Sequence, residues 1–194
     1  MLWDGTMTTS PTIDAVEAPH WTIRPELPID IDQIHELHRS AFRGPGEAEL
    51  VDAIRSSAAF VGELSLVAAT DEGSVLGHVL VSRVELERDE PDDDPARIPV
   101  LALAPIAVLP QHEARGIGTA LMRAVLAAAD TRDEPILVVV GSPAFYRRFG
   151  FVPAADHGLH GPYDDVGDAF QARARPGAEI IPGTVVYPPA FASV

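Results

Sequence analysis

Residues 98–121, IPVLALAPIAVLPQHEARGIGTAL, decide the fold of this chain. The run from Ile98 to Leu109 is almost wholly apolar, which is typical of a central strand covered on both faces. Two glycines in the segment Arg115–Gly118 let the backbone turn tightly and approach a ligand without a Cβ atom in the way. Apolar residues then recur at helical spacing, at Ile117, Ala120, Leu121, Ala124, Val125 and Ala128. The segment predicts a strand, a turn and a helix whose N-terminus suits an anion.

Two well-known kinds of phosphate site do not fit this turn. A dinucleotide fingerprint needs a third glycine at the position of Leu121. A phosphate-loop NTPase needs a lysine, and all 14 basic residues of the chain are arginines. A Gly-x-Gly turn often satisfies geometry alone, so on its own it predicts no more than a phosphate-bearing cofactor at the end of a strand.

Composition excludes several other classes of protein. The chain has 194 residues and no cysteine, so disulfides, thiolate nucleophiles and cysteine-ligated metals are absent. The formal net charge of −15 argues against nucleic acid, whose phosphates would be repelled, and mildly favours cationic partners. No apolar run is long enough to span a membrane and no signal-peptide pattern opens the chain, so we expect no membrane partner and a cytoplasmic location. We expect a flexible tail over 1–20 and a single domain over 21–194.

The remaining pattern predicts helices that alternate with paired strands. The turn Asp71-Glu72-Gly73-Ser74 indicates a hairpin, and Asp30 is the expected cap of the first helix. The crossover through the helix at 116–130 makes the strands at 100–109 and 136–140 parallel, within an otherwise antiparallel α+β sheet. The acidic loop at 88–97 lacks the spacing of a calcium loop. The other expected elements are strands at 21–24, 65–70, 75–86 and 169–174, and helices at 31–42, 47–57 and 144–149.

Three motifs together carry a family resemblance. They are Ala107-Val108-Leu109-Pro110 with the Arg115–Gly118 turn, the segment Ala144–Phe151, and the late Tyr187-Pro-x-x-Phe191. In this order they resemble the GNAT superfamily of N-acetyltransferases, and within it the YhbS-like branch, over residues 21–191. The resemblance implies a three-layer α/β/α fold with a mixed, mostly antiparallel sheet of six to seven strands and a central, splayed parallel pair. It also implies that acetyl-CoA is the cosubstrate and that a primary amine attacks it directly.

The resemblance implies a set of site residues. Ile106, Ala107 and Val108 would face the pantetheine arm, and the Val108 N–H would receive the thioester oxygen. Tyr146 would protonate the departing thiolate, and the other reading of it is a core tyrosine whose hydroxyl bonds to backbone. Ser142 would contact CoA or substrate, or cap the short helix. The pyrophosphate would lie on the backbone of Ala114, Arg115, Gly116, Ile117, Gly118 and Thr119.

The general base stays open. Glu113 stands where the family has Gln or Arg, and we expect its side chain to face solvent. His78, Glu85 and Glu47 are candidate bases, although each residue type is more often structural or solvated. His35, His38 and His112 lack a third clustered ligand, so we expect no metal.

Two other functions remain open beside the enzyme. One is a non-catalytic acyl-CoA-binding or regulatory module on the same fold, and the other is a phosphate-binding α/β domain for another nucleotide. The acceptor is a small-molecule or peptide amine that the sequence does not name, and the protein is a monomer or a homodimer.

Overall fold

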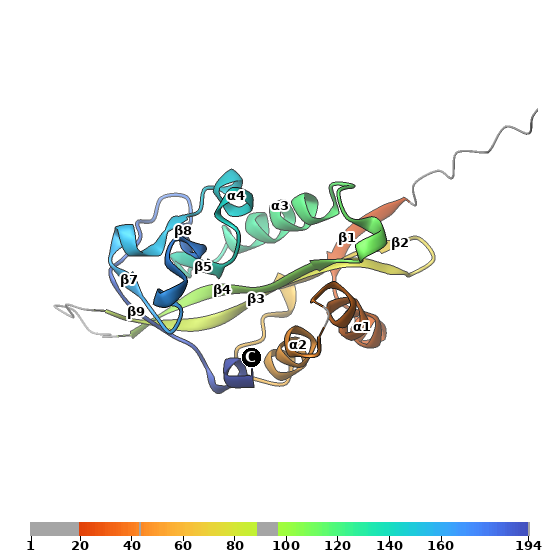
Figure 1. Ribbon diagram of the computed structural model, residues 1–194, viewed down its shortest axis with the longest axis horizontal. Helices are drawn as coiled ribbons and strands as arrows, with labels where there is room; N and C mark the ends of the chain where they lie inside the picture. Colours follow the sequence, from red (N-terminus) through yellow and green to blue (C-terminus); the bar gives the residue numbers. More distant parts are fainter. Residues whose placement is uncertain (1–19, 43, 89–96, 194) are drawn as a thin grey trace, which may run out of the picture.

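The computed structural model describes residues 20–42, 44–88 and 97–193. In these residues nine strands form one sheet, with the order β1-β2-β3-β4-β5-β8-β6, while β9 pairs with β3 and β7. Helices α1 (Ile31–Phe42) and α2 (Gly46–Arg55) cover one face, and α3 (Ile117–Ala129) and α4 (Pro143–Tyr146) cover the other (Figure 1). The strands are β1 (Trp21–Pro25), β2 (Ser65–Thr70), β3 (Val75–Arg88), β4 (Arg97–Val108), β5 (Ile136–Val140), β6 (Val152–Pro153), β7 (Leu159–His160), β8 (Phe170–Ala174) and β9 (Gly183–Val186).

The predicted fold class is confirmed, with more strands than the six to seven expected. The additional strands lie in the Gly- and Pro-rich C-terminal segment, where β6 and β7 each have two residues. Two residues are too few to produce an alternating pattern, so the sequence gives no signal for them. The predicted tail over 1–20 and the acidic loop at 88–97 lie almost wholly outside the described residues.

The two hydrophobic cores follow from alternation along the central strands. Val100 and Ala102 of β4 pack into the core under α1 and α2, whereas Leu101 and Leu103 pack into the core under α3. All four side chains are at most 4% exposed. Successive strand residues point to opposite faces, so an uninterrupted apolar run is what a sheet covered on both faces requires. The prediction from the opening segment is confirmed.

Strands β4 and β5 are parallel but separate after a short pairing. The parallel register covers only Leu101–Leu103 against Leu137–Val139. Pro105 of β4 has no N–H to donate to a neighbouring strand, and β5 ends at Val140 before Gly141. The residues of β4 beyond Leu103 therefore have no β5 partner, and the sheet opens between the two strands.

Helix α3 begins where the two glycines predict a turn. Gly116 caps the helix with φ 86°, in the left-handed region that favours glycine. Gly77 of β3 lets the helix approach the sheet, because a Cβ there would lie 2.9 Å from Ile117 Cγ2 and 3.0 Å from Leu121 Cδ1. The first turn of α3 is thereby held against the sheet, next to the place where β4 and β5 part.

Asp30 does not cap α1 as predicted. A 3₁₀ turn at Pro28–Asp30 precedes the helix, and the buried Asp30 carboxylate accepts the Leu27 N–H at 2.7 Å. The same carboxylate accepts two hydrogen bonds from the Arg24 guanidinium, at 2.6 and 2.9 Å. The acidic side chain thus points back along the chain, because a guanidinium on the adjacent strand compensates its charge inside the protein.

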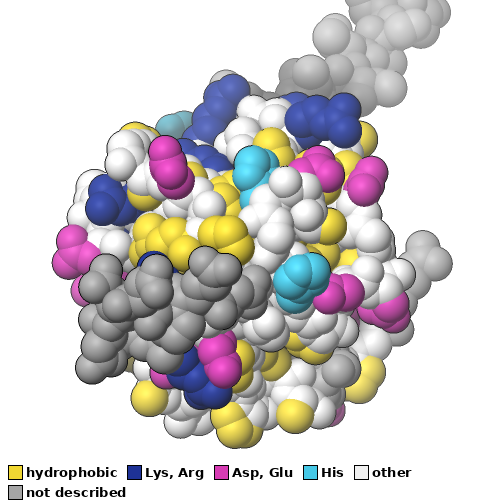
Figure 2. Space-filling view, turned by 90° about the vertical axis from the view of Figure 1, so that its left-hand side faces the viewer, with side chains coloured by type: hydrophobic (Ala, Val, Ile, Leu, Met, Phe, Trp, Pro, Cys, Tyr) yellow, Lys and Arg dark blue, Asp and Glu magenta, His cyan; other side chains and the backbone are white. Residues whose placement is uncertain are grey.

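Neither sign of charge dominates the face of the molecule that Figure 2 shows. Arginine and acidic side chains are interspersed there with hydrophobic ones (Figure 2). Among the described residues, every helix falls short of the length and apolarity needed to cross a membrane.

Candidate active site

A cavity of about 560 Å³ lies where β4 and β5 separate. One part of its wall comes from the strand ends and α4, and the other part comes from α1, α2 and the C-terminal segment on the opposite side of the sheet. A volume of this size is typical of a small-molecule site. The lining residues are Phe42, Glu47, Leu50, Leu103, Ala104, Pro105, Ile106, Val140, Gly141, Ser142, Phe145, Tyr146, Tyr163, Tyr187 and Phe191.

The free edge of β4 offers backbone groups to this opening. The Leu109 N–H donates to the Leu76 carbonyl of β3 at 2.9 Å. Backbone groups alternate in direction along a strand, so the N–H and C=O groups of Val108 and Ile106 face away from β3, toward the side that β5 has left. Ala107, which pairs with His78, points its backbone groups toward β3 and is buried. Two of the three predicted β4 residues therefore present free hydrogen-bonding groups, and Ala107 does not.

The first turn of α3 lies beside this edge. Val108 Cγ2 is 3.6 Å from where a Cβ on Gly118 would stand. The first backbone bond of the helix runs from the Ala120 N–H to the Gly116 carbonyl, so the N–H groups of Ile117, Gly118 and Thr119 precede the helical ladder. Such groups, at the positive end of the helix dipole, form an anion site.

Two arginines stand at this helix end. Arg115 is exposed and makes no ion pair with the described residues. Arg148, which sequence reasoning did not single out, donates to Thr119 Oγ1 at 3.4 Å and lies 5.7 Å from the Phe145 and Phe149 ring centroids. Its presence in an Arg147-Arg148 pair three residues after Phe145 was the available signal. Glu113 is exposed.

Tyr146 is one of the residues that line the cavity. The residue is 7% exposed, and its ring packs edge-on against Phe145 and Phe151, at centroid distances of 5.0 and 5.6 Å. The hydroxyl makes no hydrogen bond with the described residues, which removes the reading of a core tyrosine bonded to backbone. Burial raises the pKa of Tyr146 to about 12, so the phenol keeps its proton at neutral pH.

Ser142 also lines the cavity, and its hydroxyl makes no hydrogen bond with the described residues. Its carbonyl, not its side chain, receives the N–H groups of Phe145 and Tyr146, at 3.0 and 3.1 Å. The side chain makes no capping bond, so the predicted alternative of a side-chain cap is wrong. Gly141 fixes the neighbouring geometry, since a Cβ there would stand 2.5 Å from Tyr146 Cε2.

Comparison with known proteins identifies the family of this chain. The family model for the acetyltransferase (GNAT) domain matches residues 22–154. This chain belongs to the GNAT acetyltransferase family. It is 34% identical over 149 residues to the uncharacterized N-acetyltransferase YhbS of Escherichia coli, covering 77% of this chain and 84% of that protein.

Two solved structures extend the likeness of this GNAT protein. E. coli YhbS in complex with CoA has a TM-score of 0.76 at 30% identity, covering 96% of both chains. A GNAT family acetyltransferase from Brucella melitensis in complex with acetyl-CoA has a TM-score of 0.71 at 33% identity, covering 90% of this chain and 99% of the other.

Of the three candidate bases in this GNAT protein, only Glu47 lines the cavity. Glu85 lies toward the far end of β3, where its carboxylate is 3.3 Å from Arg97 in an exposed ion pair. His78 is fully buried and does not line the cavity. Glu47 lies in the first turn of α2 and makes no hydrogen bond or ion pair with the described residues. The structure thus leaves one of the three carboxylate and imidazole candidates at the site.

His78 belongs to a buried chain of hydrogen bonds. Ser65 donates to the Glu26 carboxylate at 2.5 Å, so His78 Nε2, 2.9 Å from Ser65 Oγ, is the donor to that hydroxyl. Its Nδ1 then accepts from His38 Nε2 at 2.8 Å. Burial raises the pKa of Glu26, but hydrogen bonds from His78, Arg55 and Ser65 outweigh it and bring the value to about 2. This network of hydrogen bonds stabilises the packing of α1 and α2 on the sheet.

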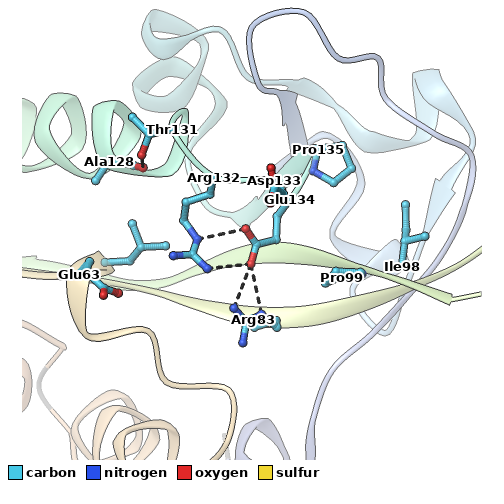
Figure 3. A pocket seen from close by; sticks show the side chains of 11 residues that line it. Glu63, Arg83, Ile98, Pro99, Ala128, Thr131, Arg132, Asp133, Glu134 and Pro135 are labelled. Atoms are coloured by element: carbon cyan, nitrogen blue, oxygen red, sulfur yellow. Dashed lines mark hydrogen bonds and ion pairs between the residues drawn. The ribbon is translucent and has the colours of Figure 1, made fainter.

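A second hollow of about 930 Å³ lies elsewhere, between the end of α3 and the strands. Figure 3 shows that three of its charged side chains point at one another: Glu134 accepts hydrogen bonds from Arg83 and Arg132, at 3.0 to 3.2 Å. The guanidiniums are thereby engaged within the protein, and none of the predicted site residues lines this hollow. The opening between β4 and β5, although smaller, is lined by several of the predicted site residues and is therefore the candidate active site.

Two of the histidines considered for metal binding have other partners. His35 pairs with Asp52 at 2.7 Å, and His38 with His78. Within the described ranges no group of three His, Cys, Asp or Glu side chains is arranged to hold a metal ion.

Proposed function

We propose that this protein is an N-acetyltransferase that moves the acetyl group of acetyl-CoA to a primary amine by direct attack, within a single domain over 21–194. The observation that carries the proposal is the cavity between β4 and β5, which brings together a strand edge without a β5 partner, the phenol of Tyr146 and the carboxylate of Glu47. Neither of these two side chains has a hydrogen-bond or ion-pair partner among the described residues. Similarity to E. coli YhbS and to the Brucella protein, whose structures contain CoA and acetyl-CoA, supports the choice of cosubstrate.

The residues present suit CoA. The N–H groups at the start of α3, from Ala114 to Thr119, would receive the pyrophosphate, with the Arg115 and Arg148 charges beside them. Ile106 and Val108 would bond to the pantetheine arm as a neighbouring strand does, and Ser142 would contact its thioester end. Glu113, exposed, keeps its charge in solvent.

The transfer then needs three contributions from the protein: stabilisation of the oxyanion, protonation of the departing sulfur and removal of the ammonium proton. The neutral amine attacks the thioester carbonyl carbon, and the Val108 N–H stabilises the oxyanion that forms. The carbon–sulfur bond breaks and the amide forms. The departing sulfur takes the proton of Tyr146, and the amide nitrogen loses a proton that restores the Tyr146 phenol. The products are an N-acetyl amine, CoA with a free thiol, and one proton from the original ammonium.

Glu47 is the residue we propose to receive the ammonium proton. An alkyl ammonium near pKa 10 is about 0.1% neutral at pH 7, a deficit of about 4 kcal/mol. Holding the amine against the thioester can supply about 7–11 kcal/mol, so placement contributes more than the strength of the base. A carboxylate at the cavity wall contributes to both, because it attracts the ammonium and accepts its proton.

Release of free thiol from acetyl-CoA tests the proposal. The chain has no cysteine, so a thiol reagent reports CoA alone. We expect amine-dependent thiol release and thermal stabilisation by acetyl-CoA and CoA but not by NAD. Stabilisation by CoA with no thiol release across a broad amine panel would favour the non-catalytic acyl-CoA-binding module, and stabilisation by neither CoA species would contradict both.

A further inference from the structure

We infer that the acceptor is a primary monoamine carried on an aromatic or compact apolar body, without a carboxylate of its own. The inference rests on the proposed function and deepens it, because it concerns the part of the cavity that faces α1 and α2. It is carried by the placement of Glu47, whose carboxylate has no partner in the part of the chain that the structure describes, in a cavity lined by several aromatic rings.

The aromatic wall is built from segments far apart in the sequence. Tyr187 lies at its centre, packed edge-on against Tyr163 at 5.3 Å and against Phe191 at 4.9 Å between ring centroids. Phe42, at the end of α1, adds a ring that is 41% exposed. Ring faces and edges of this kind bind flat apolar groups and, near an ammonium, add a cation–π attraction.

The charge of the lining decides between classes of amine. Of the described residues that line the cavity, Glu47 alone has a carboxylate, and no Asp, Arg or His is among them. An amino acid would bring a carboxylate close to Glu47 with no cation to receive it, which is unfavourable in a desolvated site. A polyamine would bury further ammonium groups against aromatic rings with a single carboxylate to pair them. One positive charge on an apolar body fits both features.

The size of the cavity agrees with a small body. Its volume of about 560 Å³ must hold the acetyl end of the pantetheine arm as well as the acceptor. The remainder suits a single ring on a short alkyl chain, with its nitrogen between Glu47 and the strand edge. Phenethylamine is therefore the probe, and ethylamine, phenylalanine and spermidine are the matched comparisons that remove the ring, add a carboxylate or add charges.

The test is a kinetic comparison of wild type with Glu47→Gln and Glu49→Gln. Glu49 lies on the same helix, is exposed and does not line the cavity, so its substitution removes the same charge from the same element. We expect phenethylamine to exceed each comparison amine at least about 10-fold in kcat/KM, because burying a ring or pairing a buried charge is worth at least that much. Glu47→Gln should lower kcat/KM for phenethylamine about 10-fold or more and leave the KM of acetyl-CoA unchanged, while Glu49→Gln changes neither.

Three results overturn the inference. One is faster acetylation of spermidine or phenylalanine than of phenethylamine, which leaves the proposed function standing. Another is equal loss in Glu47→Gln and Glu49→Gln, which means that only general surface charge matters. The third is calorimetry that finds no phenethylamine binding to the CoA-loaded protein, a readout that needs no turnover and separates this inference from failure of the proposed chemistry. Should Glu47→Gln fold poorly, Glu47→Asp is measured for the same selective loss.

Discussion

Replacing Tyr146 by phenylalanine should separate chemistry from stability. The substitution keeps the ring, whose edge-on packing against Phe145 and Phe151 is unchanged, and removes only a hydroxyl that bonds to none of the described residues. A hydrogen bond normally contributes about 1 kcal/mol, and here none is lost. We expect the free energy of unfolding to stay the same or to rise by up to about 1 kcal/mol. Tyr146→Ala, by contrast, removes the buried ring and should cost about 3–5 kcal/mol.

The rate should respond in the opposite way. General acid catalysis is worth about 10²–10⁴ in rate. Burial raises the pKa of Tyr146 to about 12, well above the value of about 8.5 that is usual for a thiol, so the phenol is a weak acid for this leaving group. We therefore expect the lower end, a fall in kcat of about 100-fold in Tyr146→Phe, or about 2.7 kcal/mol in the barrier.

The assay follows thiol release at saturating acetyl-CoA, with the Kd of CoA measured by calorimetry and stability by urea unfolding. The Kd should change less than about 2-fold, because the ring and the strand edge remain. A kcat in Tyr146→Phe that is within about 2-fold of wild type refutes the assigned acid role. Loss of CoA binding would instead show that the hydroxyl contributes to holding the cosubstrate, the other role that the resemblance implies for Tyr146.

Three further perturbations test the packing of α3, the proposed pyrophosphate site and the buried histidines. Gly77→Ala places a Cβ 2.9 Å from Ile117 Cγ2, so it should push α3 from the sheet, destabilise the protein by about 1–3 kcal/mol in urea unfolding and weaken CoA binding. Arg115→Gln should raise the Kd of CoA in calorimetry about 3- to 10-fold at low salt and less at high salt, and an unchanged Kd would place the pyrophosphate elsewhere. Burial lowers the pKa of His38 to about 2 and lowers that of His78, so the unfolded chain takes up protons below about pH 6.5 that the folded protein does not. Stability should fall as the pH drops from 6.5 to 5, by up to about 1.4 kcal/mol per pH unit for His38, and the lowered pKa of His78 adds to the fall in the same direction. A flat urea midpoint over that range contradicts this expectation.

The central strand, the turn and the crossover were predictable because they depend on local pattern. The apolar run over 98–109 and the glycines at 116 and 118 specify a buried strand and a tight helix start, whatever surrounds them. The separation of β4 from β5 was implied by family resemblance, and Pro105 gives it a physical reason. The approach of Tyr146 to the opening follows from the same crossover.

The rest of the site was not predictable, since it depends on contacts between distant segments. His78 of β3 and His38 of α1 are 40 residues apart in sequence and meet where the helix packs on the sheet, so a histidine that was a candidate base is a buried structural group. Tyr163 and Tyr187 reach the cavity from outside the predicted strand at 169–174, in a segment whose other strands, β7 and β9, have two and four residues and give no periodic signal. The sequence does not distinguish Glu47 from His78 and Glu85 as a candidate base. The packing of α2 is what places Glu47 in the wall of the cavity.

The most direct test of the central claim is mass spectrometry of amines incubated with this protein and acetyl-CoA labelled with ¹³C in the acetyl group. We expect a labelled N-acetyl product from phenethylamine that depends on wild-type protein and forms about 100-fold more slowly with Tyr146→Phe. Protein that binds acetyl-CoA in calorimetry, but transfers the label to no amine in a broad panel, would contradict the claim.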